Sequence, residues 1–71
     1  MANDWKPTRE LTPSLRGGWV MRVRGRGDLG RIEIVTLNGS SVYRCIGRHG
    51  VELGDVRTLT GAAQRLWAQT P

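Results

Sequence analysis

The sequence predicts a small α+β domain, in which one C-terminal helix packs on an antiparallel sheet of three or four strands. Three patterns lead to this fold class. Apolar and polar residues alternate in the segment 18–24, an Asn38–Gly39 pair separates two β-branched runs, and an apolar stripe recurs at helical spacing after residue 58. Period-two alternation indicates a half-buried strand, Asn-Gly favours a tight hairpin turn, and a stripe at three- and four-residue spacing indicates a helix.

Residues 1–17 are expected to form a flexible N-terminal arm ahead of the domain, which spans residues 18–71. Pro7 and Pro13 interrupt any helix in the arm, because proline lacks an amide hydrogen and disfavours helical geometry in the residue before it. The Gly17–Gly18 pair then marks a turn into the sheet. Trp5 of the arm either docks on the domain or is exposed to a ligand or partner.

Three strands follow from the residue pattern. The segment 18–24 places Trp19 and Met21 on one face and Arg22 on the other. The segment RGRGDLG (24–30) is predicted to be a loop, because glycine and aspartate favour turns. The segments 31–37 and 41–46 then form a hairpin closed by Asn38–Gly39, since both central positions of a type I′ turn need positive φ. The inner layer of the sheet is expected to contain Trp19, Met21, Ile32, Ile34 and Tyr43.

The segment 47–57 leaves two alternatives open, a short fourth strand at 51–53 or one at 56–57. The segment 58–69 is predicted to be the closing helix, with the hydroxyl of Thr58 or Thr60 as the N-cap acceptor. Gly61 weakens this helix by about 1 kcal/mol relative to alanine, which packing must offset. The apolar stripe of the helix consists of Leu59, Ala63, Leu66 and Trp67.

The length of 71 residues predicts a single domain with a marginal core. Cys45 is the one cysteine, so no disulfide forms within the chain. A zinc site needs about four ligands, and Cys45 with His49 supplies too few. We therefore expect no metal and no cofactor, and a homodimer is the remaining route to added stability.

Hydropathy predicts no contact with a membrane. No apolar run approaches the roughly 20 residues that a membrane span needs, and the first residues lack the apolar stretch of a secretory signal. With a single free cysteine, these features favour a cytoplasmic location. The bias toward arginine, glycine and alanine suggests a GC-rich coding sequence of bacterial or phage origin.

The chemistry-bearing residues do not predict an enzyme. The carboxylates are scattered over arm, loop and strands, so no two of them share one helical face. Cys45 and His49 form a thiolate–imidazole pair in principle. A small buried cysteine and a loop histidine are the simpler interpretation. The carboxylates are Asp4, Glu10, Asp28, Glu33, Glu52 and Asp55.

The predicted loop RGRGDLG matches three short motifs. It contains the integrin tripeptide Arg26–Gly27–Asp28, the Arg-Gly-Arg centre of an AT-hook, and the GxGxxG pattern of nucleotide-binding loops. The nucleotide-binding pattern requires a helix directly after the glycines, and here a strand follows. A hairpin connection with a solvated arginine is the simplest interpretation, and an AT-hook-like contact with the minor groove stays open.

Arginine is concentrated in the predicted sheet. Ten of the 11 basic residues are arginine, and seven of the 11 lie between Arg16 and Arg48. Asp28 and Glu33 oppose them there, so this stretch carries 7 − 2 = +5, which equals the formal net charge of the chain. Guanidinium groups bind phosphates and base edges through forked hydrogen bonds, and a β-ribbon can enter the major groove. We therefore predict non-catalytic nucleic-acid binding, to DNA rather than RNA. The expected contact residues are Arg22, Arg24, Arg26, Arg31, Arg44 and Arg48, and an ordinary solvated sheet face is the alternative.

The order of three strands and a helix, ending in TLTGAAQRLW, resembles a family of three-stranded-sheet DNA-binding domains. These are the arm-site-binding domains of phage-type integrases and the plant ethylene-response-factor domain. The segment from Trp19 to Arg24 matches their first or second strand. The resemblance implies a sheet lying in the major groove, with Arg22, Arg24, Arg31 and Arg44 as contact residues. The helix positions that match are Thr58, Ala62, Ala63 and Trp67.

A protein-interaction module or inhibitor is the rival functional class. Trp5, Tyr43 and Trp67 are its candidate anchors, because tryptophan, tyrosine and arginine dominate the energetics of protein interfaces. A small sheet also has open edges that accept an added strand. Under this hypothesis the chain binds a host protein or another partner protein through its exposed aromatics and a sheet edge.

Overall fold

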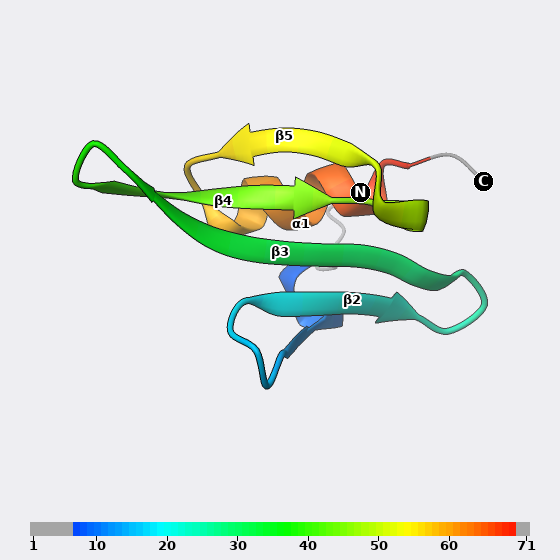
Figure 1. The fold of residues 1–71 in the computed structure, drawn as a ribbon. Helices are drawn as coiled ribbons and strands as arrows, with labels where there is room; N and C mark the ends of the chain where they lie inside the picture. The colour runs from blue at the N-terminus through cyan, green and yellow to red at the C-terminus, as the bar shows by residue number, and fades with distance from the viewer. Residues whose placement is uncertain (1–6, 70–71) are drawn as a thin grey trace, which may run out of the picture.

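The computed structural model describes residues 7–69 and, within them, shows an α+β fold with a five-stranded antiparallel sheet and a C-terminal helix on one of its faces (Figure 1). Each strand pairs with the next one along the chain, so the spatial order is β1-β2-β3-β4-β5. The elements are β1 (Leu11–Pro13), β2 (Trp19–Val23), β3 (Gly27–Leu37), β4 (Ser40–Ile46), β5 (Glu52–Val56) and α1 (Leu59–Trp67), with short 3₁₀ turns at Pro7–Glu10 and Arg48–Gly50.

The sheet has more strands than the three or four that the sequence predicts. The added strand β1 comes from the segment expected to be an arm, and Leu11 pairs with Met21 of β2. Three residues ending in a proline carry too little alternation to predict a strand, yet a proline is tolerated on an edge strand. The strand in the ambiguous segment is β5, at Glu52–Val56. Trp5 lies outside the described residues.

The predicted loop RGRGDLG is mostly strand, because a β-bulge interrupts the pattern. Met21 pairs with Gly30 and Arg22 with Asp28, so Leu29 is an extra residue on β3. A bulge re-aims the side chain that it adds, and Leu29 points into the core with no exposed surface. Gly30 has φ of 124°, and a side chain there would overlap the carbonyl of Ile46. The loop expected at 24–30 is therefore a short turn that ends where β3 begins.

Two tight turns connect β3 to β4 and β4 to β5. The predicted Asn38–Gly39 turn is confirmed, with φ of 51° and 79°. His49 and Gly50 adopt a similar geometry, with φ of 60° and 77°, and the amide of Val51 donates to the carbonyl of Arg48 at 3.2 Å. Histidine is among the residues enriched at positive φ. The His-Gly pair was therefore a turn signal that the sequence analysis did not use.

The core lies between α1 and the sheet. Thr58 is the N-cap of α1, and its hydroxyl accepts a hydrogen bond from the amide of Gly61 at 3.0 Å. Leu66 of the predicted stripe is buried. The prediction that Ile34 belongs to the inner layer is wrong, because the β3–β4 hairpin extends past α1 and leaves Ile34 54% exposed (Figure 1). The core cluster consists of Met21, Leu29, Ile32, Cys45, Ala62, Ala63 and Leu66.

Candidate nucleic-acid interface

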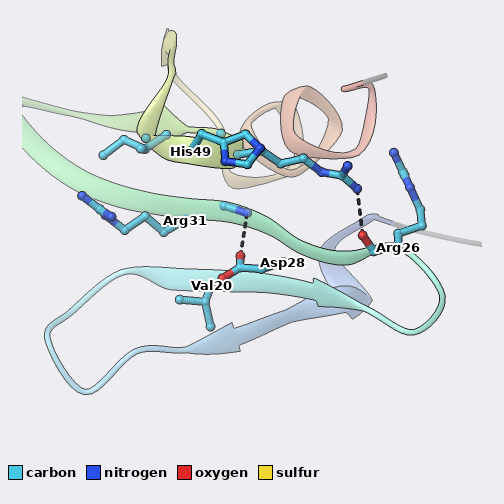
Figure 2. A pocket seen from close by; sticks show the side chains of 10 residues that line it. Val20, Arg26, Asp28, Arg31 and His49 are labelled. Carbon is cyan, nitrogen blue, oxygen red and sulfur yellow. Dashed lines mark hydrogen bonds between the residues drawn. The ribbon is translucent and has the colours of Figure 1, made fainter. Parts of the chain in front are cut away.

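Most of the predicted contact arginines gather at one end of the sheet, which we call the arginine end. It is formed by the last residues of β2, the β2–β3 turn, the start of β3, the end of β4 and the Arg48–Gly50 turn (Figures 1 and 2). Antiparallel connection brings these segments together although they are far apart in sequence. The arginine end carries Arg22, Arg24, Arg26, Arg31 and Arg48.

Arg26 holds the C-terminus of α1. Its guanidinium donates to the carbonyls of Trp67 at 3.0 Å and Gln69 at 2.8 Å, and it lies 4.6 Å from the centroid of the Trp67 ring. The last carbonyls of a helix have no partner within the helix, and a cation there also interacts favourably with the helix dipole. Arg26 is therefore committed mainly to the fold.

Arg48 and Gln69 join the same region from the other side. Arg48 donates through its guanidinium to the carbonyl of Arg26 at 2.8 Å, and its backbone amide donates to Oε1 of Gln69 at 2.9 Å. The side-chain amide of Gln69 donates to the carbonyls of Leu29 at 2.6 Å and Leu66 at 2.8 Å. Nε of Arg48 is buried and has no hydrogen-bond partner among the described residues. These contacts tie both turns of the arginine end to α1.

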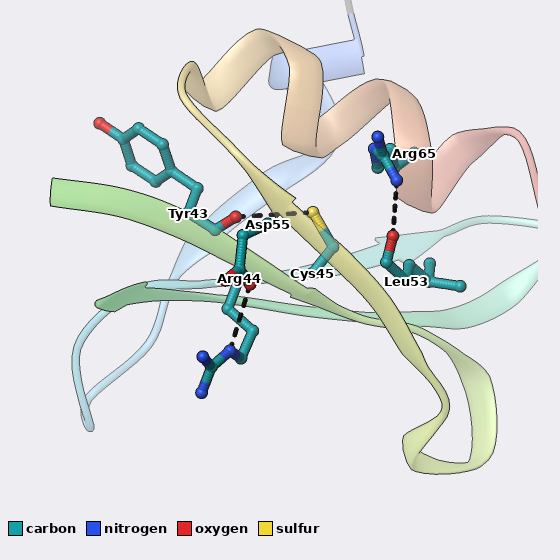
Figure 3. Close-up of polar contacts among 6 residues, drawn as sticks. All are labelled: Tyr43, Arg44, Cys45, Leu53, Asp55 and Arg65. Atoms are coloured by element: carbon teal, nitrogen blue, oxygen red, sulfur yellow. Dashed lines mark hydrogen bonds and ion pairs between the residues drawn. The ribbon is translucent and has the colours of Figure 1, made fainter. Parts of the chain in front are cut away.

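Two of the predicted contact arginines pair with carboxylates on the face opposite α1. Nε of Arg31 lies 3.4 Å from a carboxylate oxygen of Glu33, with both side chains about half exposed. Nε of Arg44 lies 3.2 Å from a carboxylate oxygen of Asp55 (Figure 3). The hydrogen bond and charge of Asp55 raise the pKa of Arg44. Surface pairs of this kind are weak, at about 0–1 kcal/mol, so a stronger anion could compete for either guanidinium.

Arg44 does not lie at the arginine end. It occupies the middle of the sheet, where its cross-strand neighbours are Glu33 on β3 and Asp55 on β5. The structure thus separates Arg44 from the other predicted contact residues. The strand register places Arg44 directly between these two carboxylates, and opposite charges on neighbouring strands attract.

Arg22 and Arg24 are the arginines at this end with unoccupied guanidinium groups. Both side chains are exposed, and neither guanidinium forms a hydrogen bond or ion pair within residues 7–69. Arg22 belongs to β2, and Arg24 follows the strand directly. Their donors are therefore available to an anion without the loss of a contact inside the protein.

A cleft of about 470 Å³ opens between β2, β3 and the Arg48–Gly50 turn. Figure 2 shows Val20 and His49 on opposite sides of it. Asp28 is the one carboxylate among the described residues that line it, and this side chain accepts from the amide of Gly30 at 2.9 Å. The cationic side chains in the lining are Arg26, Arg31 and Arg48. The sequence analysis did not assign His49 to this site, although its position in a turn beside Arg48 was visible.

No family model, curated protein or solved structure matches this chain.

The two residues weighed for nucleophilic chemistry lie in different surroundings. Cys45 has no exposed surface, and its Sγ lies 3.8 Å from the carbonyl oxygen of Ala62. Burial raises the pKa of the Cys45 thiol, which disfavours the reactive thiolate. His49 is exposed at the cleft.

Within residues 7–69 no three His, Cys, Asp or Glu residues cluster as metal ligands. No helix in this described range is long and apolar enough to cross a membrane.

Proposed function

We propose that this chain is a non-catalytic DNA-binding protein that contacts the phosphate backbone with its arginine end. The observation that carries the proposal is the placement of Arg22 and Arg24, two exposed arginines without partners among the described residues, beside a cleft lined by further cations. Phosphate contacts by arginine supply most of the sequence-independent affinity for nucleic acids.

The cleft adds a second element to the proposal. Arg31 lies on its wall, and among residues 7–69 its guanidinium pairs only with the exposed carboxylate of Glu33, at 3.4 Å, so a phosphate can compete for it. A buried donor without an acceptor costs about 1–3 kcal/mol. Nε of Arg48 has almost no exposed surface, so a phosphate oxygen in the cleft can accept from it only after the Arg48 side chain moves.

Contact around Arg22 and Arg24, at the end of the sheet, is favoured over contact through the middle of its open face, around Arg44. On that face Glu33 and Asp55 flank Arg44, and carboxylates at those positions repel a phosphate backbone. The resemblance to sheet-in-groove domains favours a broad contact across the face. The position of the arginine end favours a smaller contact area, in which the β2–β3 turn and the Arg48–Gly50 turn approach the DNA first.

The test is the affinity for a labelled DNA duplex, measured by fluorescence anisotropy at two salt concentrations. Binding by a few phosphate contacts should weaken as salt rises, with a log–log slope of about −0.9 per contact. The variant Arg22→Ala/Arg24→Ala should lose about tenfold or more in affinity, and its slope should become shallower by about two contacts.

The matched control is Arg16→Ala/Arg57→Ala. Both residues are exposed, their guanidinium groups form no hydrogen bond or ion pair within residues 7–69, and they lie at the other end of the sheet from the arginine end. This control removes the same charge from elsewhere on the molecule, so its affinity should fall much less. Equal losses in the two variants would show a diffuse charge effect, and no duplex binding at low salt would exclude the proposal. The same titration with RNA distinguishes the two nucleic acids.

Protein interaction is the alternative, and salt separates the two functions, because an apolar interface responds weakly to ionic strength. Of the candidate anchors, Tyr43 is half-buried with its ring centroid 5.8 Å from that of Trp19. Trp67 is half-buried beneath Arg26. These positions leave little ring surface for a partner, so the sheet edge is the stronger candidate for protein contact.

A further inference from the structure

The β3–β4 hairpin projects beyond the rest of the sheet. Pairing of β3 with β2 stops at Ile32, opposite Trp19, and pairing of β4 with β5 begins at Tyr43. The two strands of the hairpin continue to pair with each other as far as Leu37 and Ser40. The segment 33–42 is therefore a two-stranded ribbon, and no other strand of the described residues pairs with either side of it (Figure 1).

The ribbon has an open backbone edge along β3. In a hairpin with a two-residue type I′ turn, the residues that flank the turn form a hydrogen-bonded pair, and hydrogen-bonded pairs then alternate along the strands. Leu37 and Val35 therefore bond to β4, whereas Ile34 and Thr36 direct their amides and carbonyls outward. Among residues 7–69 no strand or turn pairs with these groups. An edge of this kind is a template for another strand.

The side chains at this edge lack the usual protection. Natural edges carry charged side chains that block strand addition. Glu33, at the base of the ribbon, is its one charged residue, and residues 34–42 include no Asp, Glu, Lys, Arg or His, although the chain as a whole is 24% charged. Ile34 is 54% exposed and Leu37 is 46% exposed. The edge also borders a notch of about 550 Å³, between the Ser14–Gly18 loop and β3, with room for the side chains of an added strand.

We propose that two copies of this chain associate through the hairpin, each adding its β3 to the open edge of the other. An antiparallel pair of identical edges is self-complementary about a two-fold axis. Two copies of a chain with net charge +5 repel each other. The hairpin lies at the other end of β3 from the arginines, in a molecule 39 Å long. Pairing through the hairpins therefore keeps the two arginine ends several Debye lengths of about 8 Å apart.

A dimer of this geometry would add stability to a chain whose core is small. Small domains with marginal cores gain stability from association when they have no disulfide or metal. The dimer leaves both arginine ends exposed, so it is independent of the proposed DNA contact. It predicts a continuous sheet running through both copies.

The test is sedimentation of the full chain over a range of concentrations up to about 1 mM, where even a weak dimer is populated. The wild type should convert from monomer to dimer. Ile34→Lys should raise the dissociation constant by about tenfold or more, because it places a like charge from each copy at the paired edge. Val51→Lys is the matched control, since it adds the same charge at a residue that is 57% exposed on the β4–β5 connection.

A second variant addresses the strand addition itself. Thr36→Pro removes an outward amide and no hydrogen bond within the hairpin, so circular dichroism should show a folded chain. This variant should remain monomeric, and it decides the question if Ile34→Lys does not fold. A wild type that stays monomeric at about 1 mM would overturn the proposal, and a different protein would then be the candidate partner for this edge. Equal weakening by Ile34→Lys and Val51→Lys, or a normal dimer of Thr36→Pro, would also overturn it.

Discussion

The two ends of this sheet are built from the same strands but are stabilised in different ways. At the arginine end, side chains of Arg26, Arg48 and Gln69 connect two turns to the last carbonyls of α1. At the hairpin end, the main-chain ladder between β3 and β4 is the principal contact, and Ile34 and Leu37 are exposed. One end therefore belongs to the cooperative core, whereas the other is a projecting ribbon.

This difference shows that a count of arginines overstates the number of available charges. Arg26 and Arg48 are engaged with backbone carbonyls, and Arg31 and Arg44 pair with carboxylates. Arg22 and Arg24 are exposed without a contact inside residues 7–69. Some guanidinium groups thus stabilise the fold and others are available to the proposed interface, and the contacts of each arginine show to which group it belongs.

The largest expected effect is on stability, from shortening a leucine at each end. Leu66→Ala empties a fully buried site under the sheet and should lower the free energy of unfolding by about 3 kcal/mol. Leu37→Ala, on the half-exposed hairpin, should cost less than about 1 kcal/mol. Urea denaturation of dilute protein measures both values. Similar losses would contradict the view that the hairpin lies outside the core.

An intermediate effect is expected from Gln69→Ala. This change removes the side-chain partner of the Arg48 amide and of the Leu29 carbonyl, while the Leu66 carbonyl keeps the backbone amide of residue 69, and the loss should cost about 2 kcal/mol. Gln64→Ala is the control, because Gln64 is exposed on α1 and its loss should change stability by less than about 0.5 kcal/mol. Thermal or urea unfolding compares the two. A neutral Gln69→Ala would mean that the arginine end is not held by this side chain.

The smallest effect concerns pH. Because burial raises the pKa of the Cys45 thiol, the folded chain keeps its proton above about pH 8.5, where the unfolded chain loses it. The contribution of Cys45 is thus fully present below that pH. It declines as the pH rises toward the folded pKa, by at most about 1.4 kcal/mol per pH unit. The stability difference between wild type and Cys45→Ala should shrink between pH 7 and 10, and parallel profiles would show an unperturbed thiol.

Local patterns in the sequence correctly predicted the hairpin at Asn38–Gly39, the helix with Thr58 as one of its two candidate caps, and much of the inner layer. Each depends on residues that are close together in the chain. Strand β1 was missed because its three residues adopt an extended conformation through pairing with β2, which no local pattern shows. The course of β3 was missed because the bulge at Leu29 breaks the period-two pattern on which strand prediction relies.

For the candidate site, the sequence indicated which arginines to consider and not how each is used. Alternation alone placed Arg22, Arg31 and Arg44 on one side of the sheet, and the register agrees with this. The contacts of Arg26 with α1 span 41 and 43 residues. No local pattern reveals such contacts, and the same is true of the cleft beside His49.

The sequence by itself determined the fold class, the turn chemistry and the excess of arginine, because these depend on short-range sterics, periodicity and composition. The tertiary structure decided which guanidinium groups remain available and where the sheet is left open. Those properties depend on how far each strand runs past its neighbour and on which carbonyl or carboxylate lies within hydrogen-bond distance. Both are set by the packing of α1 against the sheet and by two bulges, at Leu29 and at Leu53, that shift the register of the strands.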